Sequence, residues 1–524
     1  MKAIGFNNFR KFQNFPMMEL GGVNVFVGTN NSGKSTAIKA MILLLDNILS
    51  WEHHPDFGTP FARGFRFTTE SNSHLYLGGY ENSINSDANG KPMSFSFTTG
   101  NTRVSFCLCS GEKEQKDSIG TRLQVFLKHL EVENLQTKVI FYYDFDLRGF
   151  RNQGVIKISV PKNNLVLALK AFIQNISSKQ TKQDKKSDVM SNFIPSLLFE
   201  VIGAAAKGLY DAFKGNFSWD KEKLELEKSK LSAISDEQIN LWGKFQLSKL
   251  MTKTSQGNMT EALISKIEKY GDFSLYYIKE SFNQIVEDIN NLSTFNYVEA
   301  HNATHKHFVN IEDKDDFLSQ TLSKFLGEGV MDNMKVVDFV HKWLESLNIA
   351  DRFLIENPFE GMYMVKLLNK NNEAKPLGSY GTGSIQIFIL LLQIAIAIHS
   401  GKNIIMFVEE PEQNLHPSLQ SRLADLFYEV WKMTNGRVRF VVETHSEYLV
   451  RKMQVIVAKS INKGDYYLQE VNQNIKIYYF QENGEPYSMQ FMGTGHFARK
   501  FGKGFFDEAG KSYNDLARIE RGLL

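Results

Sequence analysis

The sequence feature that most constrains the fold is the segment 28–36 (GTNNSGKST), which matches the phosphate-loop pattern G-x-x-x-x-G-K-[ST] without a mismatch. The short apolar run 23–27 precedes it and the apolar stretch 37–49 follows it, so the expected order is strand, loop, helix. In such a unit, consecutive backbone N–H groups and the helix N-terminus surround a β-phosphate. The sequence therefore predicts a nucleotide-binding site.

The side chains of this loop have distinct expected roles. Lys34 is expected to reach the β- and γ-phosphates, and the Ser35 hydroxyl is expected to ligate Mg²⁺. A chance match in a glycine-rich turn is the alternative, and the flanking strand and helix make it rare. The other loop residues expected to bind the nucleotide are Gly28, Asn30, Asn31, Ser32, Gly33 and Thr36.

The composition indicates a globular protein without a dominant charge. The 524 residues are 42% hydrophobic, and 60 basic residues stand against 58 acidic ones, so no global field favours nucleic acid or an anionic membrane. The apolar run 385–398 contains two Gln and is too short for a membrane span. The first residues alternate like a strand and lack a signal-peptide segment, so we expect a cytoplasmic protein without membrane contact.

The pattern of residues changes along the chain. Residues 93–109 alternate apolar and polar side chains as sheet strands do, and strand signals continue to Ile158. Beyond Ile158, polar residues mix with Leu and Ile at helical spacing. The expected domains are an N-terminal lobe with the phosphate loop at 1–115, a largely helical insertion at 116–294, a C-terminal lobe at 295–460 and a C-terminal extension at 461–524.

Three segments of the insertion leave alternatives open. The lysine-rich run 177–187 is a solvated loop or, as the sharper alternative, a contact to nucleic-acid phosphates. The apolar stretch 193–213 suits a helix packed against another helix or subunit. The heptad-like leucines of 219–231 continue for about two heptads, which is too short for a long coiled coil.

Arg10 and a histidine cluster also allow two interpretations. Arg10 lies between aromatic residues in a strand-like segment, and it either touches the phosphate or base of a nucleotide or is a surface arginine. His301, His305 and His307 could hold a metal ion, but no carboxylate or fourth ligand has a matching spacing nearby. A polar loop is the favoured interpretation of the histidines.

A second glycine-rich segment, residues 377–384, precedes the apolar helix expected at 385–397. Glycines ahead of a long helix form an anion-binding N-terminus, and this one lacks a lysine. It suits a surface that closes over a nucleotide held by another subunit, whereas a plain helix cap with glycine turns is the alternative. The residues expected to contact the nucleotide here are Ser379, Gly381 and Gly383.

Two further buried strands are expected to end in functional side chains. The run 404–408 leads to Glu409 and Glu410, and acids at the carboxyl end of a parallel strand are the expected partners of a phosphate loop. We expect Glu409 to belong to the Mg²⁺ shell and Glu410 to polarise the attacking water. The run 439–442 leads to His445, a predicted γ-phosphate sensor because it follows a strand as the other motifs do.

These four segments, in this order and with an insertion after the first, resemble the ATP-binding-cassette ATPases of the structural-maintenance-of-chromosomes and overcoming-lysogenization-defect type within the AAA family. The resemblance implies ATP and Mg²⁺ as ligands, ATP hydrolysis, and an α/β head of two lobes in which a mixed sheet is flanked by helices. It assigns 28–36 to Walker A, Gly381 and Gly383 to the signature loop, Glu409 and Glu410 to Walker B, and His445 to the switch histidine. The signature departs from L-S-G-G-Q, and Glu409 stands where Asp is usual.

More narrowly, the segments EEPEQNLHPSLQSRLADLF and VVETHSEYLVRKM and the tail 504–508 resemble bacterial antiphage-defence ATPases, including the PtuA family of Septu and retron systems. That resemblance implies a cytoplasmic homo-oligomer that controls a separately encoded effector nuclease, of the HNH type in Septu. The alternatives are a structural DNA-tethering or repair ATPase and a nuclease of the overcoming-lysogenization-defect type. Short heptads disfavour the first, and the absence of Asp-x-Asp after Ser446 disfavours the second.

Overall fold

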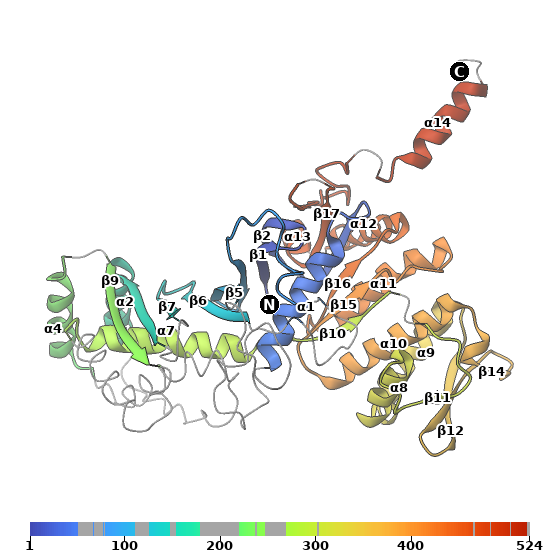
Figure 1. Cartoon of the computed structure of the whole chain (residues 1–524), viewed down its shortest axis with the longest axis horizontal. Helices are drawn as coiled ribbons and strands as arrows, with labels where there is room; N and C mark the ends of the chain where they lie inside the picture. Colours follow the sequence, from blue (N-terminus) through green and yellow to red (C-terminus); the bar gives the residue numbers. More distant parts are fainter. Residues whose placement is uncertain are drawn as a thin grey trace. The chain divides into compact units, whose positions relative to one another are not determined.

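The structure is a computed structural model of the chain (Figure 1). The residues that it describes are 1–50, 67, 77, 79–110, 125–146, 153–178, 219–235, 238–246, 269–300, 303–464, 467–482, 484–502 and 505–520. The chain divides into two compact units. Unit 1 consists of Met1–Glu19 and Leu43–Leu292, and unit 2 consists of Leu20–Ile42 and Ser293–Leu524.

The centre of unit 2 is a six-stranded sheet in the order β10-β15-β16-β3-β17-β18. The first five strands run parallel, and the short edge strand β18 pairs antiparallel with β17. β3 and β17 are buried along their whole length, as expected for parallel strands covered on both faces. The bounds are β3 (Val23–Gly28), β10 (Thr294–Val298), β15 (Ile404–Glu409), β16 (Val438–Glu443), β17 (Ile475–Phe480) and β18 (Tyr487–Ser488).

Helices complete the core of unit 2. α10 packs against α8, α9 and β10, and α11 packs against α12, β16 and β3. Among the described residues, α10 alone is long and apolar enough to cross a membrane, but 78% of its apolar window is buried, as in a core helix. The bounds are α1 (Lys34–Ser50), α8 (Phe317–Gly327), η2 (Val330–Asp332), α9 (Met334–Ser346), η3 (Leu377–Ser379), α10 (Thr382–Ser400), α11 (Pro417–Met433), α12 (Glu447–Asn462), α13 (Leu468–Asn474) and α14 (Glu508–Glu520).

A smaller antiparallel sheet also belongs to unit 2. Its central strand, β13, pairs with β11, β12 and β14. Helix α9 packs on β12, which connects this sheet to the helices around α10. The bounds are β11 (Val309–Asn310), β12 (Arg352–Phe359), β13 (Met362–Leu368) and β14 (Ala374–Pro376).

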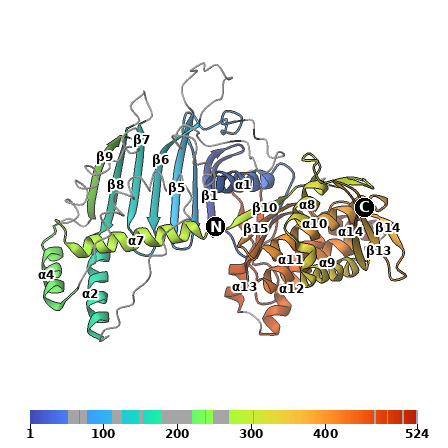
Figure 2. The ribbon, with the colours of Figure 1, turned by 90° about the horizontal axis from the view of Figure 1, so that it is seen from below.

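Unit 1 is built on an eight-stranded antiparallel sheet in the order β2-β1-β4-β5-β6-β7-β8-β9 (Figure 2). In β4, Met93, Phe95 and Phe97 are buried and alternate with partly exposed polar residues, so one face of the sheet is apolar. Helix α7 packs on β5 and β6, and α2 packs on β8 and α4. The bounds are β1 (Ala3–Phe9), β2 (Phe12–Glu19), β4 (Met93–Thr99), β5 (Thr102–Ser110), β6 (Val125–Asn134), β7 (Ile140–Asp146), β8 (Gln153–Pro161), α2 (Lys162–Ser178), α4 (Lys221–Ser232), β9 (Gln238–Gln246) and α7 (Asp272–Asn290).

The predicted α/β class is confirmed, since large sheets are flanked by helices. The observed units differ from the predicted domains. The boundary predicted at 115 separates β5 from β6, which are hydrogen-bonded neighbours in one sheet. The described part of 116–294 is mixed rather than largely helical, because it contributes β6 to β9 as well as α2, α4 and α7. The prediction missed the strand alternation of β9, where Ile239 and Leu241 are buried.

Two further segments belong elsewhere than predicted. The phosphate loop lies in unit 2 and not in an N-terminal lobe. The predicted C-terminal extension contains β17, which pairs in parallel with β3 from Ile475↔Val23 to Phe480↔Gly28. Pairing between strands so distant in sequence leaves no local pattern, so it could not be predicted. The segments 179–187 and 193–213, and His301, lie outside the described residues.

Candidate nucleotide-binding site

The phosphate loop lies between β3 and α1, as the strand, loop and helix pattern predicts. β3 ends at Gly28, whose φ is +153°, and a Cβ there would overlap the carbonyl oxygen of Phe480 in β17. Glycine is therefore required where the chain leaves β3. Asn31 and Gly33 also have positive φ, of 59° and 101°, and α1 begins at Lys34.

Lys34 is buried and points back to its own loop. It is 3% exposed, and its Nζ donates hydrogen bonds to the carbonyl oxygens of Gly28 at 3.2 Å and Thr29 at 3.0 Å. The same Nζ lies 3.9 Å from Oε1 of Glu443. The ammonium group is therefore held at the loop, from which it can reach a bound phosphate.

Glu443, the last residue of β16, contacts the predicted Mg²⁺ ligand Ser35. Ser35 Oγ donates a hydrogen bond to Glu443 Oε1 at 2.8 Å. Burial, and then the charge of Glu409, raises the pKa of Glu443 to about 7, against the opposite effects of Ser35 and Lys34. The predicted site residues do not include Glu443. The signal was available, because an acid at the end of a buried strand also identified Glu409.

Glu409 ends β15 and pairs in register with Glu443 on the neighbouring strand. Burial raises the pKa of Glu409, and a hydrogen bond with Tyr297 of β10 lowers it. Among the described residues, Glu409 Oε1 and Glu443 Oε2 are buried oxygens without a hydrogen-bond partner. Together with the Ser35 hydroxyl they form a set of hard oxygen donors, which Mg²⁺ prefers, so the residues present fit this ion.

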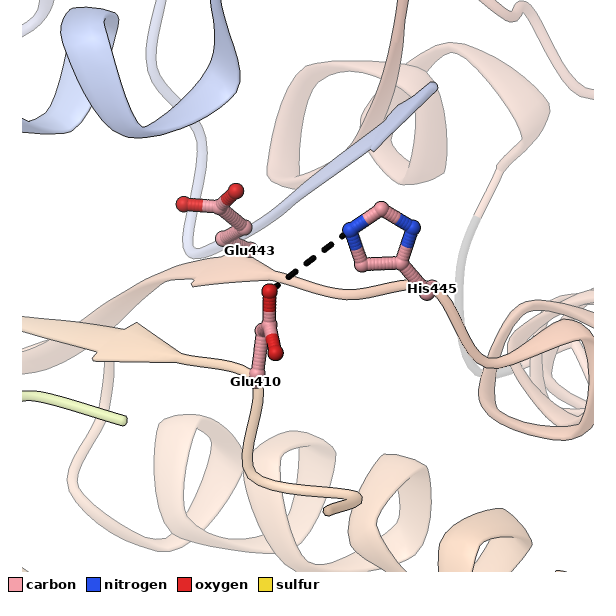
Figure 3. A group of neighbouring side chains, drawn as sticks. All are labelled: Glu410, Glu443 and His445. Carbon is pink, nitrogen blue, oxygen red and sulfur yellow. Dashed lines mark ion pairs between the residues drawn. The ribbon is translucent and has the colours of Figure 1, made fainter. Parts of the chain in front are cut away.

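Glu410 and His445 follow the ends of the same two strands and face each other (Figure 3). His445 Nε2 lies 3.6 Å from Glu410 Oε1. Burial, with a smaller effect of Lys34, lowers the pKa of His445, so the imidazole is neutral at neutral pH. In the part of the chain that the structure describes, Glu410, Glu443 and His445 form the one group of potential metal ligands with all ligand atoms within 4.8 Å.

The backbone of Glu410 is unusual. Its φ is +43°, a left-handed conformation that is uncommon for a residue with a side chain, and its N–H donates to the carbonyl oxygen of Glu443 at 2.9 Å. Such strained residues gather at functional sites when the surroundings hold them in place. The bond to β16 is one such restraint, and it fixes the start of the turn that follows β15.

Glu412 is a further residue that the predictions missed. It is buried, and its Oε1 accepts a hydrogen bond from the backbone N–H of His445 at 2.6 Å. Ser446, which follows His445 in the chain, caps α12. Its Oγ accepts a hydrogen bond from Leu449 N–H at 3.2 Å and donates one to Gln420 Oε1 at 2.6 Å. The turn after β15 therefore positions the backbone of His445. The signal in the sequence was the additional acid within the EEPEQ segment.

The second glycine loop forms the N-terminus of α10, as predicted. Gly381 is its N-cap, and a Cβ on Gly381 would meet no atom within 4 Å. Gly383 packs more tightly, because a Cβ there would lie 2.5 Å from the carbonyl oxygen of Asn414 in the turn after β15. Ser379 ends η3. The glycine loop thus packs against the turn after β15, while the space around Gly381 is open.

His305 holds this glycine loop. Its Nδ1 lies 3.2 Å from the carbonyl oxygen of Gly378 and its Nε2 lies 3.2 Å from Thr382 Oγ1. Since a carbonyl only accepts, Nδ1 carries the proton, and in the neutral ring Nε2 accepts from the threonine hydroxyl. Both ring nitrogens of His305 are thus engaged by the loop, while the polar-loop interpretation of the whole cluster stays a prediction, because His301 lies outside the described residues.

Arg10 belongs to unit 1, in the turn between β1 and β2. Its φ is +47°, and its carbonyl oxygen accepts from Asn85 Nδ2 at 2.6 Å. Burial lowers the pKa of its guanidinium. The expected contact of Arg10 with a nucleotide stays a prediction.

A parallel sheet that carries a phosphate loop on one strand, and acidic residues and a histidine at the ends of its neighbours, defines a P-loop nucleotide-binding protein. Residues 1–450 match the family model described as the AAA ATPase domain, so the chain belongs to this family.

Solved structures with a similar arrangement include three heads of Smc proteins. An Smc head bound to the C-terminal winged-helix domain of ScpA has 12% identity and a TM-score of 0.29, over 93% of this chain and 97% of that one. An Smc head derived from Pyrococcus furiosus and bound to the C-terminal domain of ScpA has 11% identity and a TM-score of 0.29, over 98% and 99% of the two chains. One from Pyrococcus yayanosii has 11% identity and a TM-score of 0.29, over 94% and 97%.

A TM-score of 0.29 is too low for this likeness to inform function or assembly. No curated protein matches the chain.

Proposed function

We propose that this chain binds ATP with Mg²⁺ and hydrolyses it at the site that Lys34, Ser35, Glu409, Glu410 and His445 form. The observation that carries the proposal is the hydrogen bond of 2.8 Å between Ser35 and Glu443, because it joins the phosphate loop to the acidic strand ends. When bound, Mg²⁺ neutralises negative charge on the β- and γ-phosphate oxygens.

The side chains of this site then have separate roles. Lys34 exchanges its bonds to the carbonyl oxygens of Gly28 and Thr29 for phosphate oxygens. The Glu410 carboxylate orients the attacking water and accepts its proton. His445, neutral and 3.6 Å from Glu410, stabilises the γ-phosphate with its imidazole N–H.

We further propose that the chain works as a homo-oligomer in which Gly381, Gly383 and Ser379 of one subunit close over the nucleotide of another. Two observations support this assignment. The space around Gly381 is open, and Gly381 is the N-cap of the long helix α10, whose N-terminus is of the kind that binds phosphate groups. Closure of two subunits on ATP would make nucleotide occupancy a switch.

The biological role that we propose is regulatory, in a cytoplasmic bacterial antiphage defence system with a separately encoded effector nuclease, for example of the HNH type. The sequence resemblance of the segments around Glu410 and His445 supports this role. Among the described residues, Glu410, Glu443 and His445 form the one cluster of three potential metal ligands, and its place at the proposed ATP site favours a separately encoded effector. Contacts of the lysine-rich run 177–187 with nucleic acid belong to the same proposal.

Two measurements test these proposals separately. The purified chain is titrated with ATP and assayed for phosphate release, with Lys342→Ala, a change at an exposed lysine, as the control for Lys34→Ala. Loss of binding in the Lys34 variant alone supports the ATP site, and unchanged affinity contradicts it. The regulatory role predicts a stable complex with the product of the neighbouring gene, whereas metal-dependent nucleic-acid cleavage by the pure chain would instead favour a nuclease.

A further inference from the structure

We propose that Glu443 is a direct Mg²⁺ ligand, alongside Ser35 and Glu409. This inference rests on the ATP site proposed above and adds a third protein group to it. The phosphate-loop motif and the acids of β15 leave Glu443 without a role, yet Glu443 is the carboxylate that contacts the loop.

The distance between the two proposed ligand oxygens fits a shared ion. Ser35 Oγ and Glu443 Oε1 are 2.8 Å apart. Ligands of Mg²⁺ bind at about 2.1 Å in octahedral geometry, so neighbouring ligand oxygens lie about 3 Å apart. An ion on the Ser35 hydroxyl therefore meets Glu443 without any rearrangement of β16.

The surroundings of Glu443 also favour a cation. Glu443 is 3% exposed, and its Oε2 has no hydrogen-bond partner among the described residues. Glu409, its register partner on β15, is also buried with an unpartnered oxygen, Oε1, among the described residues. Buried carboxylate oxygens that lack partners are unfavourable, and a divalent ion between them removes that penalty.

The ammonium group of Lys34 does not replace such an ion. Lys34 Nζ lies 3.9 Å from Oε1, beyond hydrogen-bond distance, and it donates hydrogen bonds to the carbonyl oxygens of Gly28 and Thr29. Figure 3 shows Glu410 and His445 beside Glu443, so another acid adds to the local negative charge. The alternative is that Glu443 only occupies the loop before ATP arrives, as a competitor of the phosphates.

The test is the effect of Mg²⁺ on ATP affinity in Glu443→Gln, measured by titration in EDTA and in Mg²⁺. Gln keeps the shape and the hydrogen bond to Ser35 but loses the charge. We expect affinity in EDTA at least as tight as in the wild type, and a gain on adding Mg²⁺ that falls at least about tenfold. Glu227→Gln, at a buried acid of α4 that accepts a hydrogen bond from Phe273 N–H at 3.1 Å, is the matched control and keeps the wild-type gain.

A direct reading of the ion comes from Mn²⁺ electron paramagnetic resonance with ADP bound, which does not depend on turnover. Mn²⁺ should bind more weakly to Glu443→Gln than to the wild type or to Glu227→Gln. If Glu443→Gln does not fold, Glu443→Asp moves the carboxylate back by one methylene and should also reduce the Mg²⁺ gain.

Three results are distinguishable. Tighter ATP binding by the same factor with and without Mg²⁺ means that Glu443 competes with phosphate, which overturns the proposal. An unchanged Mg²⁺ gain in Glu443→Gln, or in Glu443→Asp where that is the variant that folds, overturns it too. If the folded wild-type chain binds no ATP in either condition, the ATP site itself is wrong, and this inference falls with it.

Discussion

His445 Nε2 lies 3.6 Å from Glu410 Oε1, across the ends of two neighbouring parallel strands. The pair joins the residue proposed to activate water to the residue proposed to contact the γ-phosphate. Glu412 adds a restraint, because it accepts the backbone N–H of His445 at 2.6 Å. The turn after β15 therefore determines where the imidazole stands.

This arrangement predicts the effect of His445→Ala. ATP hydrolysis should slow by about 10², the loss typical for one preorganised hydrogen-bond donor, while ATP affinity changes little because Lys34 and Ser35 remain. Steady-state phosphate release and ATP titration measure the two quantities. His307→Ala, a change at an exposed histidine outside the site, is the control. Wild-type turnover in His445→Ala would remove the histidine from the mechanism.

Gly28→Ala should destabilise unit 2. The φ of +153° and the close carbonyl oxygen of Phe480 leave no room for a methyl group, so we expect a loss of about 1–3 kcal/mol in the free energy of unfolding. Chemical denaturation measures this loss. Gly381→Ala, with no atom within 4 Å of the added Cβ, should leave stability unchanged. Equal stability of the two variants would show that the strand-to-loop junction is misplaced.

Truncation at residue 461 should abolish ATP binding. The deleted part contains β17, whose pairing with β3 supports the strand that carries the phosphate loop. Removing residues 508–524 instead takes away α14, on which Tyr513, Leu516 and Ile519 are exposed, and should spare binding. Thermal unfolding and ATP titration of both truncations give the comparison. A chain ending at 461 with wild-type affinity would exclude β17 from the core of the site.

Gly381→Glu tests closure between subunits. A carboxylate on the open glycine should repel the phosphates of the partner's nucleotide and weaken ATP-dependent association by at least about tenfold, without changing the fold. Analytical ultracentrifugation in the Glu410→Gln background, with and without ATP, reports association. Gly327→Glu, at an exposed glycine with no atom near the added Cβ, is the control. Association that is equal in both variants would exclude Gly381 from the interface.

The sequence predicted the parts of the site that depend on local pattern. The glycines and lysine of the phosphate loop, and the acids and histidine after apolar runs, have fixed spacings, and the structure places them at the ends of β3, β15 and β16. Parallel strands present their carboxyl ends at one edge, so the motifs that follow such strands were assigned to one site, and the fold places Glu410 Oε1 3.6 Å from His445 Nε2.

Other features depend on contacts between distant segments. β17 joins β3, and β9 extends the sheet of unit 1, through backbone pairing that carries no motif. The bond from Ser35 to Glu443 depends on which strand lies beside β3, and that order became visible only in the fold. Similarly, the role of His305 in holding the glycine loop follows from the path of the chain rather than from the spacing of three histidines.

The most direct test of the proposed ATPase is phosphate release by the purified chain with Mg²⁺ and ATP, compared with Glu410→Gln. We predict measurable turnover in the wild type and a reduction by about 10²–10⁴ in the variant, the usual contribution of a positioned base. ATP affinity should be unchanged, since Lys34 and Ser35 remain. Full turnover by Glu410→Gln would contradict the assignment and direct attention to Glu409 or Glu443 as the base.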